Sequence, residues 1–281
     1  MKLQRFEDAK SFYDRVGAYL LQHEAAHNLQ LRLCKTLARN WDEYGVFPYA
    51  AVVEAGQTIL AVAICTPPFP LVLSQVEDRG AIALIAEDVL TTHPHLPGVN
   101  GPVDVSKMFA ETWQQMTGKS FKLEMALRIH ELKTVQLAST VQGQLRVATE
   151  CDRELLLQWH HEFEQEALGN LAPQNGSETW VNRTLEQQSA YLWINEKPVS
   201  LACGMECSDN SAVLNMVYTP PVHRKQGYAS ACVAALSQHL LNQGYEQCVL
   251  FTDLANPTAN KIYRAIGYQP VCDWNHFGFV N

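Results

Sequence analysis

The chain has 281 residues, of which 47% are hydrophobic and 18% charged, so it can form one large or two modest packed domains and is unlike a disordered chain. Its formal net charge of -8 argues against nucleic acid or an anionic membrane as the main partner, because both are bound through basic surfaces. No apolar run reaches the roughly 20 residues that span a bilayer, and the opening MKLQRFEDAK lacks the apolar region of a secretory signal. We therefore expect a cytoplasmic protein with reduced cysteines, with a single redox pair of Cys203 and Cys207 as the alternative.

The first half of the chain predicts a mixture of helices and strands. Helical spacing of apolar residues, alternating runs, and glycine and proline breaks define the elements. In chain order they are a helix from about Phe6 to Ala38, a hairpin of Tyr49–Val53 and Ile59–Thr66, a strand at Ala81–Leu84, a loop over Thr91–Pro102, a helix from its N-cap Asp104 to Met116 that Gly118 ends, and a strand over Lys122–Leu132.

A polar stretch, Thr134–Gln144, separates this pattern from a second one. The second pattern predicts a strand over Leu145–Ala148, helices over Cys151–Leu168 and Ser177–Gln188 with a loop at Gly169–Gly176 between them, strands over Tyr191–Ile194, Val199–Glu206 and Ala212–Tyr218, a long helix to Gln243, a strand over Cys248–Thr252, a helix over Pro257–Ile266, and one or two closing strands. We expect an α/β (α+β) fold of two related units, residues 1–138 and 144–281, each a mostly antiparallel mixed sheet flanked by helices.

A basic turn with a glycine joins the strand Ala212–Tyr218 to the long helix. Its sequence is Arg224-Lys225-Gln226-Gly227-Tyr228-Ala229. Backbone N–H groups at a helix N-terminus point outward and the helix dipole favours negative charge, so the turn is a candidate anion site. Gly227 permits a positive φ or a close approach. The structural alternative is an exposed basic corner, since neither the Walker pattern nor the dinucleotide fingerprint is present.

A polar helix face follows the next strand. Asn256 precedes Pro257, which is the pattern of a helix N-cap followed by proline at the first helical position. Asn256, Asn260 and Tyr263 are spaced at i, i+4 and i+7, so they share one face of the helix. This face suits a cleft at a strand end. The alternative is a capping asparagine beside a half-buried core tyrosine.

Together these two segments resemble the signatures of the GNAT superfamily of acyl-CoA-dependent N-acetyltransferases. The residues that carry the resemblance are Arg224, Gly227 and Ala229 in the Arg/Gln-x-x-Gly-x-Gly/Ala signature, and Asn256, Tyr263 and Gly267-Tyr268 in the second signature. The resemblance covers roughly Leu145–Phe279. The first half resembles a degenerate copy, as in tandem GNAT proteins, because its nearest candidate turn, Arg79-Gly80, lacks the spacing.

The resemblance implies an N-acetyltransferase that moves an acetyl group from acetyl-CoA to a primary amine by direct attack in a ternary complex. It implies a small-molecule or peptide amine as acceptor, and no nucleic acid, membrane or metal. Tyr263 is the implied acid that protonates the leaving thiolate. The strand after a bulge would bind the pantetheine arm and the basic turn the diphosphate. The implied cofactor-binding residues are Val217, Tyr218, Thr219, Arg224, Lys225, Gln226, Gly227, Tyr228, Ala229, Ser230, Asn256 and Asn260.

The general base is not evident from the sequence. Where many family members carry a Glu, this chain has Val213, and the remaining candidates are Glu206 and Asp253, acting through water. A non-catalytic acyl-CoA-binding module therefore stays open as an alternative. A second alternative is a zinc peptidase, because His23-Glu24-Ala25-Ala26-His27 matches the HExxH pattern on a predicted helix, with Glu43 as a third ligand.

Overall fold

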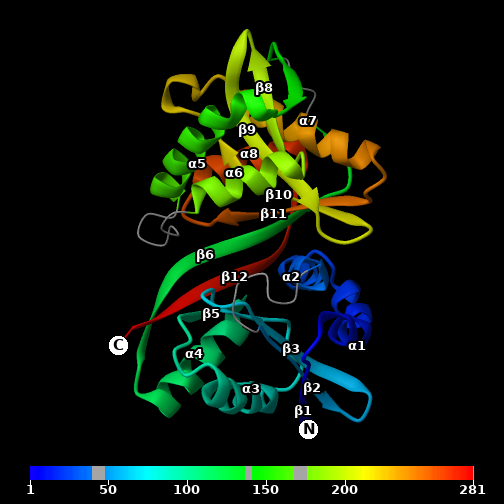
Figure 1. Cartoon of the computed structure of the whole chain (residues 1–281), viewed down its shortest axis with the longest axis vertical. Helices are drawn as coiled ribbons and strands as arrows, with labels where there is room; N and C mark the ends of the chain where they lie inside the picture. The colour runs from blue at the N-terminus through cyan, green and yellow to red at the C-terminus, as the bar shows by residue number, and fades with distance from the viewer. Residues whose placement is uncertain (40–47, 137–140, 168–175, 281) are drawn as a thin grey trace. The chain divides into compact units, whose positions relative to one another are not determined.

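The computed structural model describes residues 1–39, 48–136, 141–167 and 176–280, which form two compact units (Figure 1). The first unit contains Met1–His130, Thr252–Pro257 and Pro270–Asn281, and the second contains Glu131–Phe251 and Thr258–Gln269. The chain therefore passes from the first unit to the second after His130. The predicted boundary, between residues 138 and 144, lies further along the chain and overlaps residues 137–140, which are outside the described part. The predicted division also differs at its C-terminal end, because the last strand belongs to the first unit.

The first unit has helices on both faces of its sheet. Its elements are β1 (Lys2–Arg5), α1 (Ala9–Gln22), α2 (Asn28–Arg39), β2 (Tyr49–Ala55), β3 (Thr58–Cys65), β4 (Leu71–Leu73), α3 (Gly80–Thr92), β5 (Gly98–Pro102), α4 (Val103–Thr117), β6 (Ser120–Leu132) and the C-terminal β12 (Gln269–Val280). The strands lie in the order β1-β2-β3-β4-β5-β12-β6. The β4–β5 pair is parallel, whereas β12 runs antiparallel to β5. Side chains of α3 and α4 pack on β2–β5 to form one apolar core.

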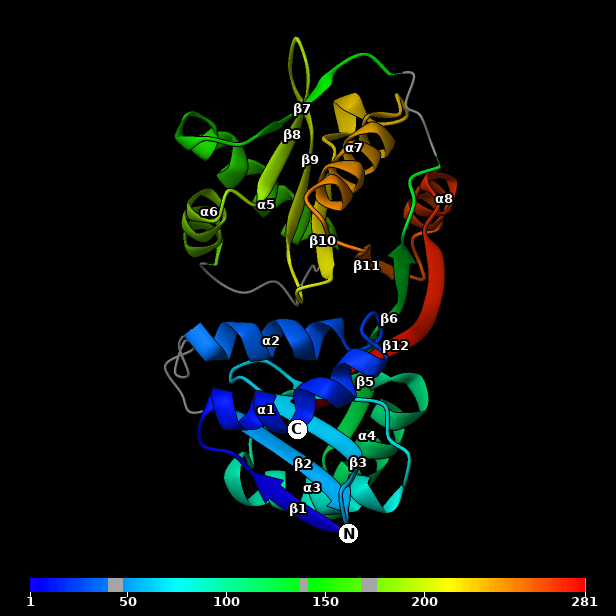
Figure 2. The same ribbon diagram turned by 90° about the vertical axis from the view of Figure 1, so that its right-hand side faces the viewer.

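The second unit contributes five strands and two apolar cores. Its elements are β7 (Gln144–Val147), a 3-10 turn at Glu150–Asp152, α5 (Arg153–Ala167), α6 (Ser177–Glu186), β8 (Ala190–Asn195), β9 (Lys197–Glu206), β10 (Ser211–Tyr218), a 3-10 turn at Pro221–His223, α7 (Tyr228–Asn242), β11 (Gln247–Asp253) and α8 (Pro257–Ile266). The strand order is β11-β10-β9-β8-β7. Helices α5 and α6 cover one face of β8–β10 and α7 covers the other (Figure 2).

The two units repeat one order of elements. Along the chain, β1 to β6 run as a strand, two helices, three strands and then helix, strand, helix and strand, and β7 to β12 repeat this order, although most of β12 belongs to the first unit. In each unit the third strand of the central group pairs in parallel with the strand that follows the next helix: β4 with β5, and β10 with β11. The predicted α/β fold of two related, mostly antiparallel units is confirmed.

Several predicted elements of the first half were wrong in detail. The expected helix from Phe6 to Ala38 is two helices separated by a turn at residues 23–27. The expected strand Ala81–Leu84 lies inside α3, whose buried residues continue to Val89 at helical spacing. The expected loop Thr91–Pro102 contains β5, which pairs with β4 on one side and with the distant β12 on the other. The N-cap of α4 is Pro102, and Asp104 lies in its first turn.

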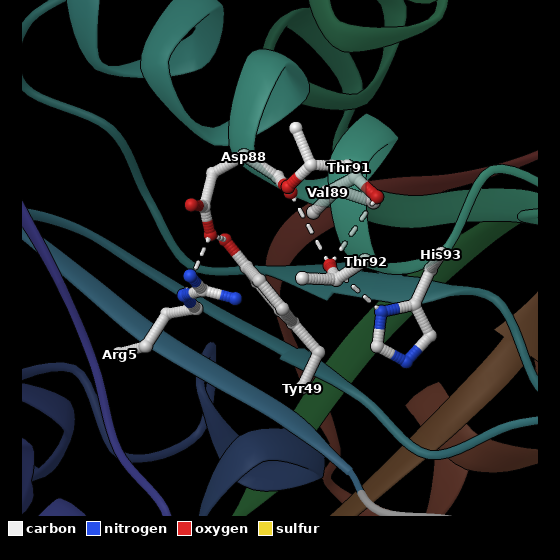
Figure 3. A network of polar contacts seen from close by, with 7 residues as sticks. All are labelled: Arg5, Tyr49, Asp88, Val89, Thr91, Thr92 and His93. Atoms are coloured by element: carbon white, nitrogen blue, oxygen red, sulfur yellow. Dashed lines mark hydrogen bonds and ion pairs between the residues drawn. The ribbon is translucent and has the colours of Figure 1, made fainter.

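Polar contacts tie the end of α3 to the edge of the first unit's sheet (Figure 3). The Tyr49 hydroxyl donates a hydrogen bond to Asp88 Oδ2 at 2.9 Å, and Arg5 Nε lies 3.5 Å from the same oxygen. Thr92 Oγ1 lies 3.0 Å from His93 Nδ1 at the helix end. Burial raises the pKa of Tyr49, so its hydroxyl stays protonated and continues to donate. These contacts join β1, β2 and α3 into one assembly.

The structure also bears on two expectations from the composition, on membrane spans and on the cysteines. Across the described ranges, no helix has both the length and the apolar character to cross a bilayer. All eight cysteines are free thiols, so Cys203 and Cys207 form no disulfide. Burial raises the pKa of Cys34 and of Cys65 to about 12, so both stay in the thiol form at neutral pH.

Candidate functional site

The parallel strands β10 and β11 pair only over their first half. Register partners run from Ser211–Gln247 to Leu214–Leu250, although β10 continues to Tyr218. On its other side, the ladder of β10 with β9 shifts between Asn215 and Tyr218, and Met216 has φ 50°. This is the predicted bulge, and it separates the residues after Met216 from the regular ladder. Backbone groups of Val217–Thr219, the predicted pantetheine-binding segment, follow this irregularity.

A row of open backbone amides lies at the start of α7. In the described part of the chain, the backbone amides of Lys225–Ser230 have no hydrogen-bond acceptor, and the helix ladder begins with Ala231 N donating to Gly227 O at 3.0 Å. Gly227 is the N-cap with φ 83°, and Lys225 has φ 62°. Six successive donors at the positive end of a helix dipole form a site for an anion. A diphosphate fits the donors of this turn.

The side chains of the basic turn differ in whether they already bond to other protein groups. Arg224 donates from Nε to Thr219 O at 2.8 Å and from NH2 to Glu166 Oε2 at 2.6 Å. Gln226 donates to Val222 O at 3.3 Å. The hydroxyl of Tyr228 accepts a hydrogen bond from Asn195 Nδ2 at 2.8 Å, which fastens the first residue of α7 to the end of β8. Lys225 is exposed and provides positive charge at the turn.

Helix α8 carries two of the other predicted residues in the second unit. Asn260 is half-buried, whereas Tyr263 is only 7% exposed and packs in the α7–α8 core beside Tyr268. Burial raises the pKa of Tyr263, and so does the nearby Cys232 thiol, so the phenol stays protonated. Asn256 is exposed and belongs to the Thr252–Pro257 segment, which groups with the first unit. Its backbone N–H donates to Asp253 O at 3.0 Å.

Register separates the candidate base Glu206 from the bulge. Glu206 lies opposite Ala212 at the start of β10, whereas Leu201 lies opposite Tyr218 at its end. Six residues of strand span roughly 20 Å, so Glu206 and the open end of β10 lie at opposite ends of the strand. Asp253 Oδ1 accepts a hydrogen bond from Ala255 N at 2.8 Å and so shapes the turn after β11. The pairing register could not be read from the sequence, which is why Glu206 stood among the candidates.

Asn215 was not selected from the sequence. It is the last residue of β10 in regular register with β9 before the bulge. Its Oδ1 is buried and has no hydrogen-bond partner within the described ranges. A buried acceptor without a donor costs about 1–3 kcal/mol, which a bound N–H group or an ordered water would offset. The signal that could have located it is a polar residue in the middle of an apolar strand.

The corresponding turn of the first unit is closed. It follows β4 and leads into α3, where Asp78 Oδ1 accepts from Gly80 N at 2.8 Å and Asp78 O accepts from Ala81 N at 3.0 Å. Ile82 N donates to Arg79 O at 3.2 Å. A carboxylate therefore occupies the place where an anion would meet the helix dipole, and it repels further negative charge. The prediction that Arg79-Gly80 is not an anion turn agrees with this geometry.

The HExxH pattern does not form a zinc-peptidase helix. Residues 23–27 form turns between α1 and α2, so His23 and His27 are not on one helix. His27 is buried, with Nδ1 donating to Leu20 O at 3.1 Å and Nε2 accepting from Gln75 N at 3.2 Å. Burial lowers the pKa of His27 to about 4. Both ring nitrogens thus serve the fold, and the suggested third ligand, Glu43, lies outside the described residues.

Comparisons with known proteins agree with this architecture. A family model described as FR47-like protein matches residues 192–276. A Drosophila protein of known structure aligns over 99% of this chain and 98% of its own, with a TM-score of 0.68 and 11% identity. A GCN5-related N-acetyltransferase from Sphaerobacter thermophilus aligns over 88% and 85%, with a TM-score of 0.62 and 16% identity. A tandem GNAT protein from the clavulanic acid biosynthesis pathway aligns over 99% and 98%, with a TM-score of 0.58 and 13% identity.

The parted strands, the open turn and these similarities define the fold as that of a GNAT-type acetyltransferase. No curated protein sequence matches the chain significantly. Because the order of elements occurs twice and the aligned tandem protein is covered along its whole length, the chain has a tandem GNAT-type fold. Among the described residues, the turn before α7 in the second unit is open, whereas the turn before α3 in the first unit is closed by Asp78.

Proposed function

We propose that the chain transfers an acetyl group from acetyl-CoA to the primary amine of a small molecule or a peptide, by direct attack in a ternary complex. The observation that carries the proposal is the row of open amides from Lys225 to Ser230 at the start of α7. The GNAT-type fold supports it, because the open turn and the parted strands occur in the same unit. The first unit would then serve the fold and not bind a second cofactor.

The loop and the strand end would share the binding of acetyl-CoA. The amides of Lys225–Ser230 would hold the diphosphate, and Gly227 would keep the turn open because its φ of 83° suits glycine. Backbone groups of Val217–Thr219 would pair with the pantetheine arm. Asn260 would line the far end of that arm. The unpartnered Oδ1 of Asn215 would accept a hydrogen bond from an N–H group of a substrate.

The chemistry needs two proton transfers. The bound thioester supplies the acetyl group, whose carbon forms a bond to the amine nitrogen as its bond to sulfur breaks. The nitrogen loses a proton to solvent, and the leaving sulfur gains one. Tyr263 would donate the second proton, because burial keeps its phenol protonated. A backbone N–H of the strand after Met216 would stabilise the negative charge on the carbonyl oxygen.

The test is incubation of the purified chain with acetyl-CoA and a panel of amines, followed by measurement of free thiol and acetylated amine. We expect both products to appear in equal amounts. Tyr263→Phe should lower turnover about 10- to 100-fold with little change in acetyl-CoA affinity, because a proton donor contributes mainly to the transition state. Tyr191→Phe is the matched control, since Tyr191 is a half-buried tyrosine on β8 outside the proposed machinery. Equal loss in the two variants would reject the role of Tyr263.

One observation favours a second candidate, a non-catalytic acyl-CoA-binding module. The position of the usual family carboxylate is Val213, and Glu206 lies at the wrong end of β10. Such a module would bind acetyl-CoA through the same turn and release no thiol with any amine. Tight binding without thiol release would therefore support the module over the enzyme.

A further inference from the structure

Helix α5 presents three polar side chains at four-residue intervals: Gln158, Glu162 and Glu166. This spacing places them on one face of the helix. Gln158 Nε2 donates to Glu162 Oε1 at 2.9 Å, so the first two are joined directly. We call these three residues the α5 ladder. It faces the segment that links the bulged strand to the open turn.

The two carboxylates of the α5 ladder bind the two ends of that segment. The hydroxyl of Tyr218, the last residue of β10, donates a hydrogen bond to Glu162 Oε2 at 2.7 Å. Arg224, which follows the 3-10 turn Pro221–His223, donates to Glu166 Oε2 at 2.6 Å. Burial and the bond to Glu162 raise the pKa of Tyr218, so this phenol stays a donor. The hydrogen bonds from Gln158 and from Tyr218 lower the pKa of Glu162, so this group stays an acceptor.

Arg224 also closes the segment on itself. Its Nε donates to Thr219 O at 2.8 Å, and its guanidinium carbon lies 5.9 Å from the centre of the Tyr218 ring. On the opposite side, Ser200 Oγ contacts Tyr218 O at 3.2 Å and Thr219 Oγ1 at 2.9 Å. The strand end is therefore held between β9 and α5. The open amides begin at the residue directly after Arg224.

The charge on Glu166 distinguishes two roles for this arrangement. If Arg224 served as a ligand of the diphosphate, Glu166 would compete with the anion for the guanidinium, and its negative charge would weaken binding. If Arg224 instead holds the turn in shape, Glu166 supports binding despite its charge. The three donor–acceptor contacts of Arg224 and Tyr218, all between 2.6 and 2.8 Å, favour the second role.

We propose that Glu162 and Glu166 are positioning residues, which hold Tyr218 and Arg224 so that the amides of Lys225–Ser230 face the cofactor. The proposal rests on the proposed function, since the turn is taken to bind acetyl-CoA. Arg224 acts through the shape of the turn, and Lys225 with the end of α7 supplies the positive potential. Removing a carboxylate of the α5 ladder should then weaken acetyl-CoA binding, although it makes the site less negative.

The experiment compares the wild type with Glu166→Gln, Glu162→Gln, Arg224→Gln and the double variant of Glu166 and Arg224. Glu154→Gln is the matched control, because Glu154 is an exposed carboxylate two turns before Glu162 on the same stripe of α5. Calorimetry gives the dissociation constant for acetyl-CoA. Hydrogen–deuterium exchange of residues 219–231 in the ligand-free chain reports the mobility of the segment without any cofactor. Thermal midpoints show that each variant is folded.

We expect Glu166→Gln to raise the dissociation constant about two- to fivefold, the range for an exposed ion pair, and to speed exchange in residues 219–231. Arg224→Gln should have a similar effect, and the double variant should add little to either single one. Glu154→Gln should match the wild type. Tighter binding or unchanged exchange in Glu166→Gln would overturn the positioning role. A wild type that does not bind acetyl-CoA would refute the proposed function, and the exchange data would still decide whether the α5 ladder holds the segment.

Discussion

Gly227→Ala tests whether the open turn depends on a left-handed residue. Gly227 has φ 83°, a conformation that costs other residues about 1–2 kcal/mol. An added Cβ would also lie 2.8 Å from Val141 Cγ2, closer than an ordinary contact. The turn can relieve this strain by moving residue 227 to a negative φ, which redirects the neighbouring amides. We expect acetyl-CoA affinity to fall about tenfold, which corresponds to about 1.4 kcal/mol.

Gly118→Ala is the matched control for this change. Gly118 has φ 74° at the C-terminal end of α4 in the first unit, and a Cβ there would meet nothing within 4 Å. It should show the backbone strain in urea unfolding without any change in the calorimetric affinity. The reasoning is refuted if Gly227→Ala binds acetyl-CoA as the wild type does while losing no more stability than Gly118→Ala.

Three further predictions concern stability and stoichiometry. Asp152→Asn should lower the free energy of unfolding by about 2 kcal/mol at neutral pH, because the hydrogen bonds from Arg146 hold the pKa of Asp152 at about 2, below its usual 3.8. That contribution is present above pH 3.8 and is lost as the pH falls through 2, so urea titrations of the two proteins should converge in acid. Calorimetry should give one acetyl-CoA per chain, since Asp78 closes the first unit's turn; two sites would contradict this. Deleting residues 270–281 should speed amide exchange throughout β5, because β12 is its antiparallel partner, and unchanged exchange would argue against that pairing.

Local sequence signals were sufficient to predict most helices and strands of the second unit. Helix α8 has the predicted bounds, because the Asn256-Pro257 start and the Gly267 stop act within the segment itself. The turn before α7 was located for the same reason, since its glycine and its helix start are adjacent in sequence. The order of elements in the second half also follows from local patterns.

Features that depend on distant pairing were not accessible from the sequence. Strand β5 looked like a loop because its partner β12 lies more than 160 residues later in the chain. Glu206 was chosen without the β9–β10 register, which assigns it to the far end of the strand. Likewise, the HExxH pattern does not reveal that both ring nitrogens of His27 are hydrogen-bonded, Nδ1 to Leu20 O and Nε2 to Gln75 N.

The antiparallel pairing of β5 with β12 has a consequence for how the chain is made. Translation proceeds from the N-terminus, so the earlier half, including β4 on one side of β5, emerges long before β12 on the other side. Its sheet stays unfinished until β12 has left the ribosome. The first unit therefore cannot complete its fold before the second half of the chain has been made.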